Sequence, residues 1–118
     1  LSPAKSALRR NINFTLHQDS PVKMPNQILA MHNAVNRQTQ SGRILGADQR
    51  LSTMEAIKAL TINAAYQYFE EDEKGSIEEG KVADFVILDR NPLDVNLSEI
   101  KEIKVLETIK EGNTIYKK

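Results

Sequence analysis

The sequence predicts an α/β unit followed by an all-β tail, and three observations support this fold class. In the first part of the chain, apolar side chains recur at three- and four-residue spacing, which is typical of amphipathic helices. After the acidic run at residues 70–74 the period changes to the one found in strands. The composition changes between the two patterns near residues 72–75. We therefore expect one unit at residues 1–72 and a second at residues 73–118.

The first unit is predicted to begin with a helix and a strand. Ser2 and Pro3 suit a helix start, because Pro is favoured at the first helical position, and the helix is expected to end near residue 10. Residues 12–16 are β-branched and aromatic, which indicates a short strand. A polar turn is expected after it at residues 19–21.

Two longer helices are predicted next, separated by a polar loop at residues 38–50. Residues 26–37 have apolar side chains at helical spacing. Ser52 and Glu55 form a capping box at the start of a second helix, residues 52–69. Its buried stripe is expected to consist of Met54, Ile57, Leu60, Thr61, Ala64, Ala65 and Tyr68.

The second unit is predicted to consist of short strands. Glu111, Gly112 and Asn113 include the Gly and Asn that a tight hairpin turn prefers. A turn is also expected at Gly80. The expected strands are residues 76–77, 84–89, 103–110 and 114–118, with one helical turn at 97–102.

The composition excludes several classes of protein. The 16 basic and 16 acidic side chains cancel, and the chain has few aromatic residues and no Trp, so neither nucleic acid nor a membrane surface is an expected partner. The absence of Cys excludes disulfides, thiolate metal sites and a cysteine nucleophile. The longest apolar run, residues 85–88, is too short to span a bilayer. Without a signal-peptide pattern, the cytoplasm is the expected compartment.

His17 and Asp19 are the candidate site residues. At the carboxyl end of a strand both side chains can project into a crevice, where an aspartate can accept a proton or contact a metal. The alternative is that Asp19 only braces the turn before Pro21, because Asp often binds local backbone amides. Spacing alone favours the turn.

The remaining polar candidates have structural explanations. His32 shares a helical face with apolar residues and is expected to be a satisfied, partly buried histidine. Asp84 is expected to bind backbone at the start of a strand. With two His and no Cys, the chain offers no complete metal-ligand set of its own.

Residues 51–95 strongly resemble the C-terminal segment of amidohydrolase-superfamily enzymes. In that family a helix with the pattern EAI..LT.N.A leads into a segment with the pattern G.I..GK.AD.V.LD, where each dot stands for any residue. Residues 105–117 resemble the final hairpin of the family. The residues that carry the match are Glu55, Ala56, Ile57, Leu60, Thr61, Asn63, Ala65, Gly75, Ile77, Gly80, Lys81, Ala83, Asp84, Val86, Leu88 and Asp89.

The resemblance implies a fold in two parts: the end of a (β/α)₈ metallo-hydrolase barrel, followed by part of a composite β-sandwich built from both ends of a longer chain. It assigns structural roles in that sandwich to Gly75, Gly80, Lys81, Ala83 and Asp84. Within the family, the chain looks most like the amidohydrolase 3 (YtcJ-like) branch. The residues that carry this likeness are Asp19, Pro21, Val22, Val35, Arg37 and Thr39.

The resemblance also implies a role for Asp19. Residues 14–22 would be the eighth barrel strand and its loop, where family members carry an aspartate that contacts the metal centre and takes the proton from the hydrolytic water. His17 could be a substrate contact. The branch more often has a small residue before the aspartate, and here Gln18 takes that place.

The other metal ligands of the family would lie before Leu1, where the chain starts without Met. We therefore expect the last quarter of a longer protein, whose partners are its missing N-terminal part, a small-molecule substrate and further copies of itself. The intact enzyme is expected to use a divalent metal, with Zn²⁺ as the expected ion, to hydrolyse non-peptide C–N bonds in amides or cyclic amides.

Three hypotheses follow. In the first, this fragment of the enzyme binds no metal and is inactive by itself. The second is a non-catalytic binding or assembly module derived from the amidohydrolase tail, in which Asp19 is a turn residue. The third is an inactive member of the family. The first is favoured.

Overall fold

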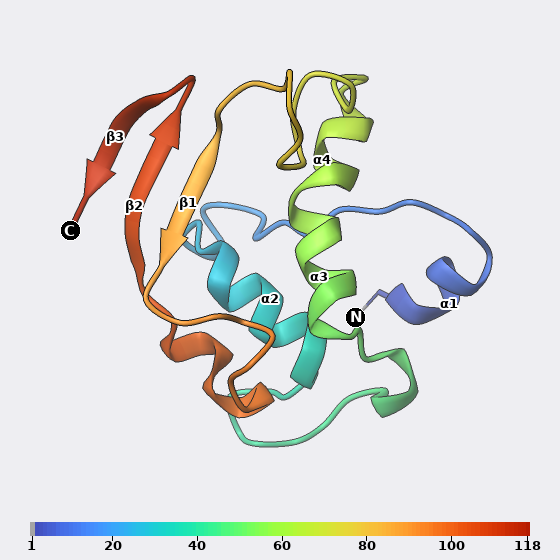
Figure 1. Cartoon of the computed structure of the whole chain (residues 1–118). Helices are drawn as coiled ribbons and strands as arrows, with labels where there is room; N and C mark the ends of the chain where they lie inside the picture. The colour runs from blue at the N-terminus through green and yellow to red at the C-terminus, as the bar shows by residue number, and fades with distance from the viewer. Residues whose placement is uncertain (1) are drawn as a thin grey trace.

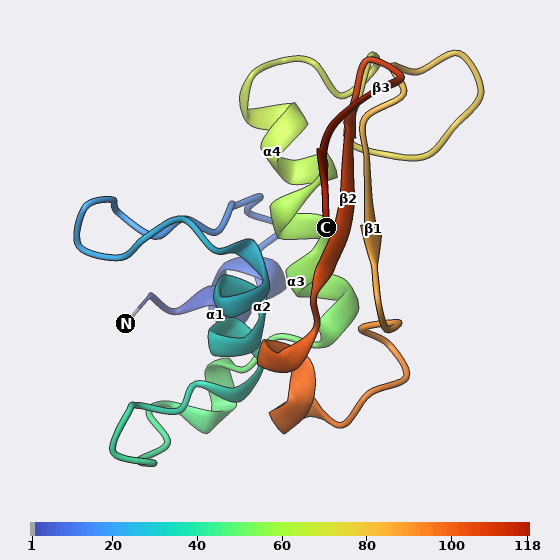
Figure 2. The same cartoon turned by 90° about the vertical axis from the view of Figure 1, so that its left-hand side faces the viewer.

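The computed structural model describes residues 2–118, so the first residue of the expected 1–72 unit lies outside it. A layer of helices packs against one face of a three-stranded sheet (Figures 1 and 2). The elements in chain order are α1 (Ala4–Arg9), α2 (Gln27–Asn36), η1 (Ala47–Gln49), α3 (Thr53–Leu60), α4 (Ile62–Gln67), β1 (Phe85–Leu88), η2 (Leu97–Glu102), β2 (Val105–Lys110) and β3 (Asn113–Lys117).

The core lies where α2, α3 and η2 meet. Ile100 of η2 is fully buried, and Val35 of α2 is almost so. Burial of such side chains contributes about 1.5–3 kcal/mol each. The whole cluster consists of Met31, Val35, Leu51, Ala56, Ile100 and Ile103.

Local signals place the N-terminal starts of α2 and α3 as the sequence predicts. The side chain of Asn26 accepts a hydrogen bond from the amide of Leu29 and caps α2. The capping box of α3 is present: Ser52 Oγ accepts from the Glu55 amide at 3.2 Å, and Glu55 Oε2 accepts from the Ser52 amide at 2.7 Å.

The single helix expected at residues 52–69 is wrong, because the chain breaks into α3 and α4 at Thr61. Thr61 has φ −122° and ψ −93°, and its hydroxyl donates to the carbonyl of Ile57 at 2.8 Å. Such side-chain bonding to the preceding turn competes with the helical backbone and bends helices. Thr61 therefore interrupts the helix between α3 and α4.

The buried stripe expected on this helix is also partly wrong. Met54 and Tyr68 are exposed, whereas Ala56 and Ala59 are fully buried. Small side chains there let α3 approach α2 closely, so the bulky residues of the predicted stripe lie at the edge of the contact.

The C-terminal sheet is antiparallel, with strand order β1-β2-β3. Glu111 and Gly112 both have positive φ, 50° and 77°, as a two-residue hairpin loop requires. The predicted hairpin is therefore confirmed. Residues 76–77 do not form the predicted strand, because they lie in a loop whose polar groups bind Lys81 and Glu78 rather than another strand.

Residues 12–16 are not a strand in this structure, contrary to the sequence prediction. The segment between α1 and α2 passes α4 and projects on the side away from the sheet (Figure 2). Among the described residues, no backbone-to-backbone hydrogen bond involves residues 13–18. The side chains favour a strand, but the part of the chain that is described offers them no partner strand.

Candidate functional site

Asp19 lies where the extended segment turns back toward α2. Its backbone has φ 56°, a left-handed conformation that is uncommon for residues other than Gly. Its carbonyl accepts a hydrogen bond from the amide of Val22 at 2.9 Å, across a cis peptide bond between Ser20 and Pro21. The turn that the sequence predicts is therefore present.

The carboxylate of Asp19 takes no part in this turn. The side chain is exposed, and within residues 2–118 it forms no hydrogen bond or ion pair. Asp commonly braces a turn through its side chain, but here the backbone alone closes it. The carboxylate is thus available for another ligand.

The segment before Asp19 is bound to side chains of α4 and to the residue that precedes α2. Asn63 of α4 donates from Nδ2 to the Phe14 carbonyl at 3.1 Å, and the Thr15 hydroxyl donates to Gln67 Oε1 at 3.0 Å. Gln18 donates from Nε2 to the Asn26 carbonyl at 2.7 Å, just before α2. These contacts were not predicted as part of a site, although Asn63 was one of the residues that carried the resemblance.

His17 is exposed, and within the described chain it forms no hydrogen bond with Asp19. It borders a small pocket of about 270 Å³ between residues 16–23 and α2. Gln18 and Lys23 line the same pocket, but Asp19 does not. The structure therefore does not join His17 and Asp19 in one cavity, and a substrate contact by His17 stays a prediction.

In the region of Asp19, a single side chain is suited to bind a metal ion. The Asp19 carboxylate is a suitable oxygen ligand for a divalent ion, but residues 2–118 contain no group of three or more His, Asp or Glu side chains that could hold one. A firm metal site needs three or four protein ligands. Asp19 thus fits a metal as one ligand of a larger set.

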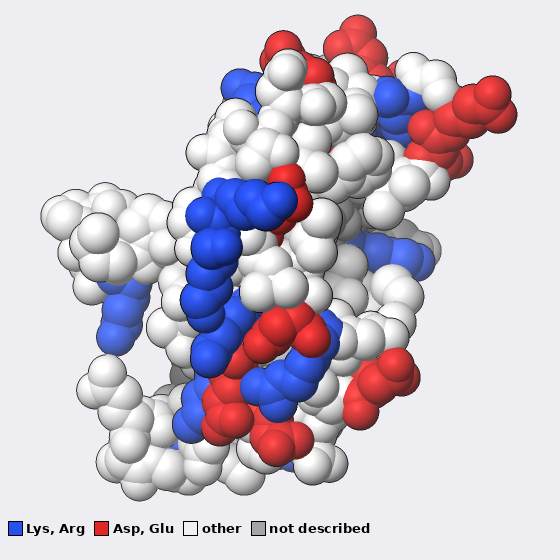
Figure 3. All heavy atoms as spheres, turned by 60° about the vertical axis from the view of Figure 1, so that its left-hand side comes forward, with Lys and Arg blue, Asp and Glu red and all other residues white. Residues whose placement is uncertain are grey.

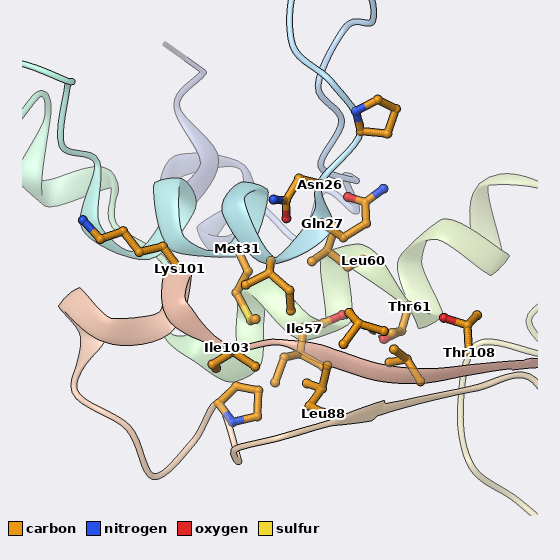
Figure 4. Close-up of a pocket in the computed structure, with 15 residues that line it drawn as sticks. Asn26, Gln27, Met31, Ile57, Leu60, Thr61, Leu88, Lys101, Ile103 and Thr108 are labelled. Carbon is orange, nitrogen blue, oxygen red and sulfur yellow. Dashed lines mark hydrogen bonds between the residues drawn. The ribbon is translucent and has the colours of Figure 1, made fainter. Parts of the chain in front are cut away.

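A cavity of about 740 Å³ lies between the helices and the sheet rather than beside Asp19. Figure 4 shows Met31 and Ile57 pointing from the helices toward Leu88 and Ile103. Among the described residues that line it, Lys101 alone has a titratable side chain. The cavity is an apolar gap in the packing and supplies no acid–base pair.

His32 is a structural histidine, as the sequence predicts. It is 7% exposed, and its Nδ1 lies 3.2 Å from Asn36 Nδ2. Burial, with the nearby charge of Lys101, lowers the pKa of His32, so the neutral ring is favoured. A neutral ring paired within its own helix has no role in the Asp19 region.

Asp84 is structural too, in agreement with the sequence. Its Oδ1 accepts from the Glu111 amide at 2.8 Å and so stabilises the hairpin turn. Asp89 does the same at the other end of β1, where its Oδ1 accepts from the Lys104 amide at 2.8 Å. Asp84 and Asp89 therefore each bind a backbone amide, one at each end of the β1–β2 pair.

Lys81 and Gly75 shape the loop before β1. Lys81 Nζ donates to Ser76 Oγ at 2.7 Å and forms an ion pair with Glu78 at 2.9 Å. Gly75 has φ 91°, and a Cβ there would lie 2.7 Å from Cβ of Ala65. Only Gly allows this loop to pack so closely on α4.

Charges on the surface are mixed. Figure 3 shows basic and acidic side chains next to one another on the face in view. Among the described residues, no helix has the length and apolar character needed to cross a bilayer.

The family is shown by the match of residues 1–116 to the amidohydrolase 3 model, described as the amidohydrolase family. The chain therefore belongs to the amidohydrolase family, and the resemblance drawn from its motifs is confirmed.

Two curated relatives match nearly the whole chain. The N-substituted formamide deformylase of Arthrobacter pascens is 35% identical over 118 residues, which is 100% of this chain and 22% of that protein. YtcJ of Bacillus subtilis (strain 168), named as an amidohydrolase, is 26% identical over 117 residues, 97% of this chain and 22% of that protein. The chain thus spans about a fifth of the length of these relatives.

Two solved structures contain the same arrangement of elements. An amidohydrolase from Thermotoga maritima MSB8 has a TM-score of 0.72 at 24% identity, covering 100% of this chain and 27% of that one. Guanine deaminase from E. coli has a TM-score of 0.71 at 21% identity, covering 97% of this chain and 30% of that one. The fold of this chain therefore occurs within proteins of the amidohydrolase fold.

Proposed function

We propose that this chain is the C-terminal part of a metal-dependent amidohydrolase that cleaves non-peptide C–N bonds in amides or cyclic amides. In this proposal residues 1–72 contribute the last barrel strand and its helices, and residues 73–118 contribute strands of a composite β-sandwich. The family match supports the class. The 35% identity to a protein named as a formamide deformylase supports an amide substrate.

The uncommitted carboxylate of Asp19 is the observation that carries the proposal. An Asp in a turn commonly binds nearby backbone through its side chain. The Asp19 carboxylate, however, forms no hydrogen bond or ion pair with any described residue. Among the described residues, the backbone of residues 13–18 forms no backbone-to-backbone hydrogen bond, and this gives independent support, because the backbone groups of an extended segment in a folded protein normally pair with another strand. A barrel strand paired with strands outside this chain would satisfy them.

Asp19 would act as the general base and then the general acid. Its carboxylate would accept a proton from the attacking water and pass it to the leaving nitrogen, a transfer that typically contributes 10²–10⁴-fold to the rate. Asp19 would also be one ligand of a divalent ion, for which we propose Zn²⁺, and this ion would polarise the scissile carbonyl. The other ligands would come from outside residues 2–118.

The proposal is tested in the longer protein that contains this chain. We expect Asp19→Asn to lower turnover of amide substrates by at least 10²-fold, because the amide cannot take the proton. Turnover by the 118-residue chain alone should be absent in the presence of Zn²⁺.

Undiminished turnover by Asp19→Asn would remove Asp19 from the mechanism and favour the binding or assembly module. Metal-dependent amidase activity of the 118 residues alone would contradict the division of the site between this chain and the rest of the protein.

A further inference from the structure

The backbone that leads to Asp19 is held by one face of α4. Asn63 and Gln67 are four residues apart, so their side chains lie on the same side of the helix. Asn63 binds the carbonyl of Phe14 at 3.1 Å, and Gln67 accepts from the hydroxyl of Thr15 at 3.0 Å. Two adjacent residues of the extended segment are therefore bound to one short helix.

The loop that follows α4 packs closely against this helix. α4 itself begins directly after Thr61, where the helical backbone of α3 ends. The Gly75 loop then packs against the helix: a Cβ on Gly75 would lie 2.7 Å from the Ala65 side chain and 3.0 Å from Ile62 Cα. The loop therefore packs tightly against α4, the helix that holds the segment before Asp19.

A second contact lies immediately next to Asp19. Gln18 Nε2 donates to the carbonyl of Asn26 at 2.7 Å and lies 3.3 Å from Gln27 Oε1. Asn26 is also the residue that caps α2 through its side chain. Gln18 therefore connects the peptide before Asp19 to the N-terminus of α2, a helix whose Met31 and Val35 lie in the core.

We propose that Gln18 and Asn63 are positioning residues, which hold the backbone on the N-terminal side of Asp19 so that its carboxylate keeps one place and direction. This inference rests on the proposed function. The backbone of Asp19 is left-handed, a conformation that costs residues other than Gly free energy although Asp tolerates it better than most, so contacts from the surrounding structure help to keep it. Displacement of a catalytic group by about 1 Å can cost a large factor in rate.

The experiment uses the longer protein with two single substitutions. Gln18→Met keeps the length of the side chain and removes the donor, and Asn63→Leu does the same with a branched side chain of similar size. Gln40→Met is the matched control, because Gln40 is exposed and lies in the loop after α2. For each protein we would measure kcat, KM, Tm, and the metal content after gel filtration with a chelator.

We expect kcat of Gln18→Met and Asn63→Leu to fall three- to tenfold with KM changed less than twofold. Both variants should also lose metal to the chelator faster than the control does, because Asp19 is proposed to be one of the ligands. Asn63→Ser replaces Asn63→Leu if the latter does not fold. The control should match the unsubstituted protein in all four measurements.

The inference is overturned if both variants lower only Tm while kcat per folded molecule and metal retention stay at the control values. Its failure differs from failure of the proposed function. If Asp19→Asn is inactive and the positioning variants are fully active, only the positioning role is wrong. If Asp19→Asn keeps full turnover, the catalytic role of Asp19 is wrong and the positioning role is overturned with it.

Discussion

Glu55 is a residue at which stability should depend on pH. Its carboxylate accepts from the Ser52 amide at 2.7 Å and from Lys5 Nζ at 2.6 and 2.7 Å. Burial by itself would raise the pKa of Glu55, but the bonds from Lys5 and Ser52 outweigh it and lower the pKa. A lowered pKa means that folding favours the ionised carboxylate. The contribution is therefore complete above the unfolded pKa of about 4.3 and is lost as pH falls through the lower folded pKa.

We expect Glu55→Gln to lower the free energy of unfolding by about 0.5–1 kcal/mol at pH 7, because Gln keeps the capping geometry but loses the ion pair, which is partly exposed. Urea unfolding at pH 7, 5 and 3 would measure the difference between the two proteins. The difference should shrink between pH 5 and pH 3. A difference that stays constant over this range would contradict the assigned cause.

Asp84 should contribute to stability through the hairpin rather than to chemistry. Asp84→Ala removes the acceptor of the Glu111 amide, in a turn where Glu111 already has φ 50°. A hydrogen bond to a charged acceptor contributes about 1.5–3 kcal/mol, and exposure places the expected loss near the lower end of this range. Urea unfolding would measure it, with Asp72→Ala as the control, since Asp72 is exposed. Equal effects of the two substitutions would argue against this role.

At the scale of elements, the features that short stretches specify could be predicted from the sequence. The capping box at Ser52 and the hairpin at Gly112 depend on residues a few positions apart, and both are confirmed. The break at Thr61 was missed, because a Thr hydroxyl can bond either to solvent or to the preceding turn, and the sequence does not distinguish these. Residues 12–16 have the composition of a strand, but a strand also needs a partner, which no local pattern can supply.

In the candidate site, too, the features specified by a short stretch could be predicted, and the contacts between distant residues could not. Asp19 was proposed from its place before Pro21 and from the family motif, and its role stays a prediction. The bonds from Gln18 and Asn63 join residues 8 and 49 positions apart, so only the folded structure shows them.

The loop between α4 and β1 gives a prediction with a matched control. Gly75 and Gly80 both have φ 91°, so replacement by Ala strains either backbone by about 1–2 kcal/mol. At Gly75 the new Cβ would also lie 2.7 Å from Ala65, whereas no atom lies within 4 Å at Gly80. We expect Gly75→Ala to cost about 1–3 kcal/mol more than Gly80→Ala, the usual cost of overpacking. Similar urea midpoints for the two variants would show that α4 or the loop can move apart freely.

At the scale of the whole molecule, the chain leaves a large amount of apolar side chain in contact with solvent. On the sheet, Val86 is 54% exposed and Ile115 is 63% exposed. The apolar cavity of about 740 Å³ between the sheet and the helices is also open. Extensive apolar surface of this kind marks a contact with another polypeptide or drives association. The edge strands β1 and β3 add unpaired backbone groups that favour the same outcome.

We therefore expect the isolated 118-residue chain to associate as its concentration rises. Light scattering coupled to gel filtration, from about 1 to 100 μM, should show an increasing average mass, and Val86→Lys together with Ile115→Lys should reduce it by introducing charge on the sheet. Glu79→Lys is the control, because Glu79 is exposed outside the sheet and the change introduces a Lys there. A constant monomeric mass at every concentration would contradict the expectation, and it would mean that the exposed sheet needs no covering polypeptide. Association that the control suppresses as strongly as the sheet variants would point to net charge as its cause, because apolar contact through the sheet would not respond to a charge placed elsewhere.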